Sequence, residues 1–329
     1  MVGPSPVFMD YIGRVLPSLG EDSVTLHSLG QAASDVLGVS ASRLDRGATA
    51  VAKGSLRVLP VLKRLVELPV IELPEGGLRL TVKGEVFGLS LGRLAAIRHQ
   101  ALSGRTYHAA RPAAERAAVA ELWRQPGADQ VAEGERHFAD LVTESAGFAA
   151  FLDAWWPPLE AADVLRRLAD PATARAVAAD DLAPDEVEAL VASYGPPDFS
   201  VADIALLDEL AALLGPRPRR EEPDLFLEGF GSLPEVVTLA DRLAEQRDEA
   251  DEPTVHSTYA HVLVDEAQDV TPMQWRMLRR RGAQASWTIV GDPALSSWPD
   301  PGEAARSLAH LVGTSARRDF RLSTNYRSP

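Results

Sequence analysis

The spacing of hydrophobic residues changes along this chain and predicts where its strands and helices lie. Near the C-terminus two short apolar runs, Val262–Val264 and Thr288–Val290, are each followed by a carboxylate, at Asp265 and Asp292. Short continuous apolar runs are typical of strands buried in a parallel sheet. A capped helix starting at Thr271 has the length needed to connect two parallel neighbours. The pattern predicts an α/β fold with both acids at one edge of the sheet.

Elsewhere the pattern predicts mainly helices. Helical spacing follows a cap at Ser5 and recurs at 58–68, 91–102 and 113–123, whereas alternation predicts strands at 23–29, 78–82 and 85–89. The aromatic cluster ending in Trp155-Trp156 also has helical spacing, which favours a core role over base stacking. The stretch Gly47–Ser55 is expected to be a loop. Arg279–Arg281 fall in the last turn of a helix, where they complement its dipole, so they do not indicate a nucleic-acid patch.

Composition narrows the function classes. The chain has 329 residues, 46% of them hydrophobic and 24% charged, which indicates a globular protein with a sizeable core. It contains no cysteine, which excludes disulfides and cysteine metal sites and favours a cytoplasmic location. No apolar run approaches membrane-spanning length. The net charge of −14 argues against a simple nucleic-acid-binding module. Residues 221–252 hold eleven acidic residues against two arginines, which indicates either a solvated segment or one that contacts a basic protein surface.

Three strings near the C-terminus carry a family resemblance. They are VDEAQD at 264–269, VGDPALSSW at 290–298 and NYRS at 325–328. In this order they resemble motifs II, III and IV of UvrD-like superfamily 1 helicases. VGP at 2–4, ADIALLDE at 202–209 and PMQWRML at 272–278 resemble the HelD branch, whose members are ATPases that bind RNA polymerase. The resemblance covers both ends of the chain well and the middle poorly.

The resemblance implies a nucleotide site built from these motifs. It makes Asp265 the Mg²⁺ ligand, Glu266 the activator of the attacking water, and Gln268 the link to motif III. Asp292 would lie at the nucleotide, Tyr326 would stack on the adenine, and Arg327 would reach the γ-phosphate. These last two residues, taken without the motifs, would be an ordinary exposed pair.

Two departures from the family pattern limit this expectation. No Gly-x-x-x-x-Gly-Lys-[Ser/Thr] phosphate loop occurs in the sequence, and the string at 47–55 is the nearest to one. Leu295 stands where motif III has a glutamine that senses the γ-phosphate, and leucine forms no hydrogen bond. We therefore expect Mg²⁺ and ATP to be cofactors of a longer parent protein, and neither to bind this chain tightly.

The expected organisation is an incomplete RecA-like domain, of the P-loop NTPase type, with a mainly helical insertion. Residues 1–50 and 199–316 form the RecA-like part, 51–198 the insertion with a possible hairpin, and 317–329 the start of a second RecA-like domain. The leading hypothesis is a fragment of a HelD-like ATPase that acts on RNA polymerase. The alternatives are a fragment of a DNA-translocating repair helicase, or a non-catalytic interaction module with relic motifs. Nucleic acid is a possible partner that the charge does not favour, and a membrane is not expected.

Overall fold

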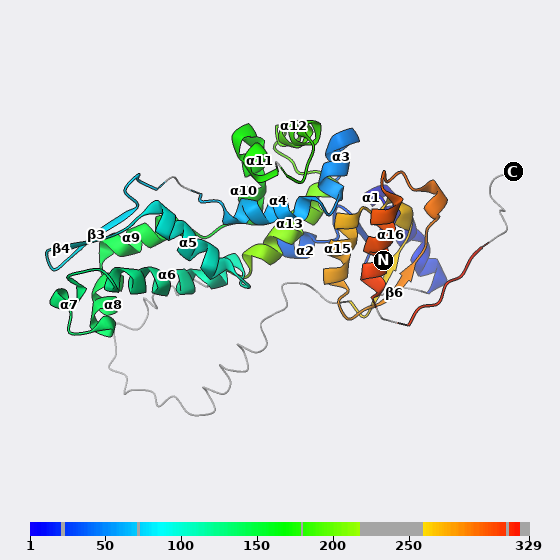
Figure 1. Cartoon of the computed structure of the whole chain (residues 1–329). Helices are drawn as coiled ribbons and strands as arrows, with labels where there is room; N and C mark the ends of the chain where they lie inside the picture. Colours follow the sequence, from blue (N-terminus) through cyan, green and yellow to red (C-terminus); the bar gives the residue numbers. More distant parts are fainter. Residues whose placement is uncertain (21–23, 71–72, 179, 218–258, 314–315, 323–329) are drawn as a thin grey trace, which may run out of the picture.

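The computed structural model describes residues 1–20, 24–70, 73–178, 180–217, 259–313 and 316–322. The molecule is elongated, with a small sheet and its helices at one end and a helical lobe, residues 47–214, extending from it (Figure 1). The long helix α13 (Val201–Leu214) runs through the middle. None of the described helices has the length and apolar character that crossing a membrane requires. The fold is α/β, as the sequence predicts, and is consistent with part of a RecA-like helicase domain.

The sheet has four parallel strands in the order β2-β1-β5-β6. The strands are β1 (Val2–Gly3), β2 (His27–Ser28), β5 (His261–Val264) and β6 (Ser286–Ile289). Four residue pairs align β5 with β6, from His261 opposite Ser286 to Val264 opposite Ile289. The prediction that the two C-terminal apolar runs are neighbouring parallel strands is confirmed. The strand predicted at 23–29 is shorter than expected, because β1 has only two residues and so pairs with only two residues of β2.

Local capping fixes the helices around the sheet. They are α1 (Pro6–Val15), α2 (Ser34–Leu37), α15 (Pro272–Arg281) and α16 (Pro301–Val312), with a 3₁₀ turn at Leu16–Leu19. Ser5 accepts a hydrogen bond from the Phe8 amide and caps α1. Thr271 and Gln274 form the predicted capping box of α15. The cap accounts for the abrupt start of the helix that connects β5 with β6.

The helical lobe contains one hairpin, whose strands β3 (Leu78–Val82) and β4 (Glu85–Leu89) pair antiparallel as predicted. Its α-helices are α3 (Gly47–Gly54), α4 (Val58–Glu67), α5 (Leu91–Leu102), α6 (Tyr107–Trp123), α7 (Ala128–Val131), α8 (Glu135–Thr143), α9 (Ala146–Trp155), α10 (Ala161–Arg166), α11 (Pro171–Ala178), α12 (Pro184–Ser193) and α13, with a 3₁₀ turn at Arg167–Ala169. Trp155 and Trp156 are buried in the core, as the helical spacing predicts.

In this lobe the start of one predicted helix and the assignment of one predicted loop were wrong. The helix predicted at 113–123 begins at Tyr107 and continues through Pro112, because Tyr107 is buried and its hydroxyl donates to the carbonyl of Pro157. The stretch Gly47–Ser55 is not a loop but helix α3. Lys53 of that helix is fully buried between the carboxylates of Asp45 and Asp203, at 3.1 and 2.8 Å. These ion pairs hold the helix in place.

A network of ion pairs around two buried carboxylates joins α13, in the middle of the molecule, to α15 beside the sheet. Asp208 and Glu209 of α13 face three arginines of α15: Arg276, Arg280 and Arg281. Arg280 donates to both carboxylates at 2.6–2.7 Å. Burial lowers the ability of water to screen such pairs, so they fix the orientation of α13 against the helix that follows motif II. Two of the three arginines of the 279–281 triplet are thus structural.

Candidate functional site

The two acids predicted to meet at one sheet edge do so. Asp265 directly follows β5, and Asp292 follows the end of β6 by three residues. Both are therefore at the carboxyl edge of neighbouring parallel strands, where ligand groups converge in open α/β sheets. The backbone continues the ladder beyond the strands, since the Ala267 amide donates to the Val290 carbonyl at 3.0 Å. This contact holds the segment after motif II against the segment after β6.

Glu266 has a backbone conformation that is unusual for a side-chain-bearing residue. Its φ is +51°, in the left-handed region, one of two such non-glycine residues in the described chain. Conformations of this kind cost free energy and occur at functional sites and turns. The turn places the Glu266 carboxylate at 2.5 Å from Nε2 of Gln268, which donates to it. The Glu266 amide donates to the carboxylate of Asp265 at 2.9 Å.

Gln268 bridges the two motifs. While its Nε2 donates to Glu266, its Oε1 accepts a hydrogen bond from the Asp292 amide at 3.0 Å. Position 291 requires glycine because a Cβ there would lie 2.9 Å from the backbone nitrogen of Ala267, and it would also lie 2.8 Å from Gln268 Oε1. The Gln268 carbonyl also accepts from the hydroxyl of Ser296 at 3.2 Å. The side chain predicted to couple motif II with motif III is therefore in contact with both.

The hydrogen bonds continue from motif III to the helical lobe. The Trp298 amide donates to Ser296, and its indole Nε1 donates to Glu303 at 3.1 Å. The other carboxylate oxygen of Glu303 accepts from the hydroxyl of Ser55 and the amide of Leu56, both at 2.8 Å. An unbroken chain of contacts thus runs from Glu266 to the junction between α3 and α4. We call this chain the Gln268–Glu303 relay.

Sequence reasoning missed the relay because its members are far apart in the chain. The Trp298 ring also packs on Gly54, where an added Cβ would lie 2.8 Å from it. Trp298 is therefore in contact with Gly54 and half-buried. Leu295, in contrast, is exposed and forms no side-chain hydrogen bond, as its chemistry requires.

The carboxylates fit part of a magnesium site. In the part of the chain that the structure describes, no group of three or more His, Asp or Glu side chains could hold a metal ion alone. Mg²⁺ is usually held by one or two carboxylates, with nucleotide phosphates and water as its other ligands, so Asp265 suits that role. Burial, and then the negative charge of Glu266, raise the pKa of Asp269 above its usual value. A cation at this edge would offset that accumulation of negative charge.

Three predicted features lie outside the described residues. They are the proposed adenine-stacking Tyr326, the proposed γ-phosphate ligand Arg327, and the acidic segment 221–252. The roles assigned to them remain predictions. Asp265, Glu266, Gln268 and Asp292, in contrast, are brought together as expected.

With this geometry established, comparison with known proteins gives a match over the same region. Residues 233–296 match the UvrD/REP helicase N-terminal domain. This range contains the string at 264–269 and residues 290–296 of the string at 290–298, so the contacts of Gln268 with Glu266 and Asp292 lie within the region that matches this domain. The chain is also similar to the RecBCD enzyme subunit RecB of two strains of Mycobacterium tuberculosis. The identity is 34% over 110 residues, which cover 33% of this chain and 10% of RecB.

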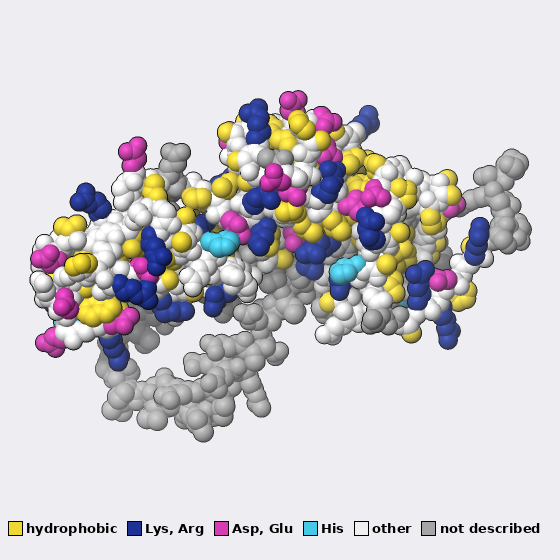
Figure 2. Space-filling model, in the orientation of Figure 1, with side chains coloured by type: hydrophobic (Ala, Val, Ile, Leu, Met, Phe, Trp, Pro, Cys, Tyr) yellow, Lys and Arg dark blue, Asp and Glu magenta, His cyan; other side chains and the backbone are white. Residues whose placement is uncertain are grey.

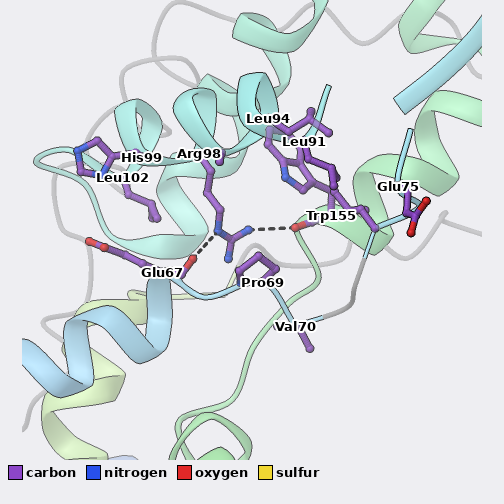
Figure 3. Close-up of a pocket in the computed structure, with 12 residues that line it drawn as sticks. Glu67, Pro69, Val70, Glu75, Leu91, Leu94, Arg98, His99, Leu102 and Trp155 are labelled. Atoms are coloured by element: carbon purple, nitrogen blue, oxygen red, sulfur yellow. Dashed lines mark hydrogen bonds between the residues drawn. The ribbon is translucent and has the colours of Figure 1, made fainter. Parts of the chain in front are cut away.

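The sheet edge that carries Asp265 and Asp292 is separate from a large apolar cleft in the described part of the chain. That cleft, of about 700 Å³, lies in the helical lobe between α5, the end of α9 and the segment after α4 (Figure 3). Arg98 crosses it and donates to the carbonyls of Glu67 and Trp155 at 2.9 and 3.0 Å. Burial lowers the pKa of Arg98. No predicted site residue lines this cleft, and Arg98 joins α4 to α9 across it.

Proposed function

We propose that this chain supplies the motif II and motif III part of an ATP site in a larger helicase-type motor. The observation that carries the proposal is the Gln268 bridge, which links Glu266 to the Asp292 loop at the carboxyl edge of two parallel strands. The matched helicase domain and the RecB similarity support it. The match covers about 10% of the length of RecB, so we propose the ATPase activity for a longer protein that contains this chain.

The proposed roles follow the chemistry of each side chain. Asp265 holds Mg²⁺, which when bound neutralises charge on the phosphates, and Glu266 orients and polarises the attacking water. Gln268 keeps Glu266 aimed and communicates the state of the site to motif III. Tyr326 and Arg327 complete the site at the adenine and the γ-phosphate. No phosphate loop is present in the sequence, so we expect this chain alone to bind nucleotide weakly and to turn over no ATP.

The test of the Gln268 role uses the full-length protein that carries this chain. Gln268→Ala should lower ATP turnover by at least about 10-fold, the effect expected from misplacing a catalytic group, while ATP affinity changes little. Ser297→Ala, at an exposed neighbouring position, is the matched control and should leave turnover unchanged. Equal loss of affinity and turnover would assign Gln268 to nucleotide binding. Full turnover in Gln268→Ala would remove the proposed coupling, and no turnover in the wild type would favour the relic-module hypothesis.

For the partner we infer RNA polymerase, as in HelD-like ATPases. Two observations support this. Residues 221–252 carry a net charge of −9, which suits a basic protein channel and repels nucleic acid. The resemblance to processive helicases implies an aromatic-Arg segment for holding single strands where this chain has Ser296-Ser297-Trp298, and the indole of Trp298 donates to Glu303. A DNA-translocating repair helicase is the alternative, favoured by the RecB similarity.

A polymerase pull-down separates these two partners. The full-length protein should recover RNA polymerase, and recovery should fall when the acids at 221–252 are changed to Asn and Gln. The contact should also weaken as salt rises, since salt screens exposed charge over roughly 8 Å at physiological strength. Equal recovery of RNA polymerase by the wild type and the variant would mean that residues 221–252 are only a solvated segment. No recovery by either, together with efficient strand separation, would support the repair-helicase alternative.

A further inference from the structure

The apolar cleft of the helical lobe follows one face of α5. The residues that α5 contributes to its lining are Leu91, Leu94, Ala95, Arg98, His99 and Leu102. They are spaced by three or four residues, with adjacent pairs, so they lie on one side of the helix. The remaining apolar lining comes from the segment after α4 and from the last residue of α9. A cleft of about 700 Å³ with mainly apolar walls has the size and character of a small-molecule site.

The apolar walls of this cleft are partly open to solvent. Val70, after α4, is 42% exposed and Leu91 of α5 is 41% exposed. In the space-filling view hydrophobic side chains are visible on the surface of the helical lobe, between scattered charged groups (Figure 2). A ligand that covers such surface is favoured because it removes apolar area from water. The walls therefore suit a ligand with a hydrocarbon body.

The cleft also contains a buried cation. Arg98 is 4% exposed, and in the part of the chain that the structure describes no ion pair joins it to a carboxylate. It donates to the carbonyls of Glu67 and Trp155, while the ring centroid of Trp156 lies 4.7 Å from its guanidinium carbon. A guanidinium has five N–H donors, so these carbonyls leave donors for a ligand. Carbonyls carry only partial charge, so the formal charge of Arg98 is not neutralised by an acid.

A second arginine adds positive charge at the same end of α4. Arg167 donates to the carbonyls of Leu65 and Pro69 at 3.0 and 2.8 Å. Burial, and then the charge of Arg98, lower the pKa of Arg167. The negative end of the α4 dipole offsets part of the positive charge of the two arginines. An anion beside Arg98 would offset more of it.

The two carboxylates that line the cleft lie at its margins. Figure 3 shows Glu67 and Glu75 on either side of Arg98. Glu75 is exposed, and Glu67 is 4.0 Å from Lys63 on the surface of α4. Water and salt screen exposed charges, whereas a buried charge is screened much less. Arg98 therefore determines which charge a ligand can bring into the cleft.

We propose that this cleft binds a small amphipathic carboxylate, with its hydrocarbon chain along α5 and its carboxylate on Arg98. A guanidinium and a carboxylate form strong charge-assisted hydrogen bonds, and the attraction grows where water is excluded. Helix α5 has 12 residues and is about 18 Å long, which accommodates an extended acyl chain such as that of decanoate. The cleft is separate from Asp265 and Asp292, so this proposal can fail while the proposed function stands, and the reverse also holds.

The experiment measures binding of decanoate and of decanol to the full 329-residue chain by isothermal titration calorimetry, with both ligands below the concentration at which they aggregate. Decanoate should bind with one equivalent per chain. Decanol has the same hydrocarbon chain without the charge, so it should bind at least about 10-fold more weakly, as expected from the loss of a hydrogen bond to a charged group. No binding of decanoate, or equal binding of the two ligands, would overturn the proposal.

A blocking substitution shows where the ligand binds. Ala95 and Ala96 are neighbouring exposed residues of α5, and Ala95 lines the cleft whereas Ala96 does not. Ala95→Phe should occupy part of the cleft and abolish decanoate binding. Ala96→Phe adds the same side chain outside the cleft and should bind decanoate like the wild type. Equal binding by the two variants would place the ligand elsewhere and overturn the proposal.

A charge substitution tests the role of Arg98. Arg98→Gln removes the charge, keeps an amide that donates to carbonyls, and should abolish the preference for decanoate over decanol. Arg167→Gln removes the same charge from the same end of α4 without changing the cleft lining, and should retain the preference. Circular dichroism verifies that both variants fold, and the substitutions at Ala95 and Ala96 decide the question if Arg98→Gln does not. Equal loss of the preference in both arginine variants would overturn the proposal.

The same variants distinguish a small molecule from a protein partner. An amphipathic acidic helical peptide is the probe for a protein partner, because it also offers apolar side chains and a carboxylate. It should bind the chain more weakly than decanoate does. Tighter binding of this peptide than of decanoate, abolished by Ala95→Phe, would assign the cleft to a protein partner and overturn the proposal.

Discussion

The buried lysine of α3 gives a sharp test of how the helical lobe is attached. Lys53 is fully buried, forms ion pairs with Asp45 and Asp203, and lies over the ring of Tyr194 at 4.6 Å. Lys53→Met keeps the apolar stem and removes the charge, which leaves two buried carboxylates near one another. Removing one partner of a buried ion pair costs about 3–5 kcal/mol. The expected loss in the free energy of unfolding is of that size.

The chain offers a matched control for this substitution. Lys63 pairs with Glu67 at 4.0 Å on the surface of α4, and its side chain is 70% exposed. Exposed i,i+4 pairs contribute about 0.3–0.5 kcal/mol, so Lys63→Met should change stability by no more than that. Both variants are measured by urea unfolding, with circular dichroism and tryptophan fluorescence as independent probes.

A second substitution tests whether the cost is electrostatic. Asp203→Asn in the Lys53→Met background removes one of the two buried charges and retains the side-chain oxygen that accepts from the Ser200 amide. The double variant should be more stable than the sum of the single effects predicts, by about 1 kcal/mol or more. A Lys53→Met variant within about 1 kcal/mol of the wild type, or strictly additive effects, would refute the reasoning.

Three further outcomes are expected. Protonation of His108 should destabilise the fold, because burial lowers the pKa of its imidazole. The stability that the neutral form contributes is fully present above the unfolded-state pKa of about 6.5 and is lost as pH falls through the folded-state pKa. His108→Gln should therefore lose this pH dependence in urea unfolding. Glu266→Gln should lower the raised pKa of Asp269 in a carbon-13 carboxyl titration, because it removes a neighbouring negative charge; an unchanged pKa would leave burial as the cause. In protein labelled with 5-fluorotryptophan, Ser296→Ala should shift the fluorine resonance of Trp298, assigned with Trp298→Phe, because it removes the hydroxyl that joins the Gln268 carbonyl to the Trp298 amide. An unshifted resonance would mean that the relay is not continuous.

The parts of the fold that the sequence predicted correctly are those determined by residues close to one another in the sequence. The parallel pair β5 and β6, the capping box at Thr271 and the hairpin at 78–89 each depend on a pattern within a few residues. Proximity of Asp265 and Asp292 also followed, because parallel strands place their carboxyl ends at one edge.

The parts that sequence missed depend on residues distant in the chain. Lys53 looked like a residue of a loop because Asp45 and Asp203 approach it only in the folded protein. The relay through Trp298 and Glu303 requires the α3–α4 junction to lie against α16, which no local pattern indicates. The arginine triplet was assigned to the helix dipole alone, whereas Arg280 and Arg281 bind α13 and Arg279 faces outward.

The central claim is that Glu266 acts on water at an ATP site completed in the full-length protein. Its most direct test is ATP turnover by that protein with and without Glu266→Gln, alongside Glu188→Gln, an exposed glutamate of α12, as control. Loss of a positioned general base lowers turnover by about 10²–10⁴-fold, so Glu266→Gln should fall by that factor and still bind ATP with Mg²⁺. The control should retain wild-type turnover. Turnover by Glu266→Gln within about 10-fold of the wild type would contradict the account, since that loss lies below the range expected for a general base.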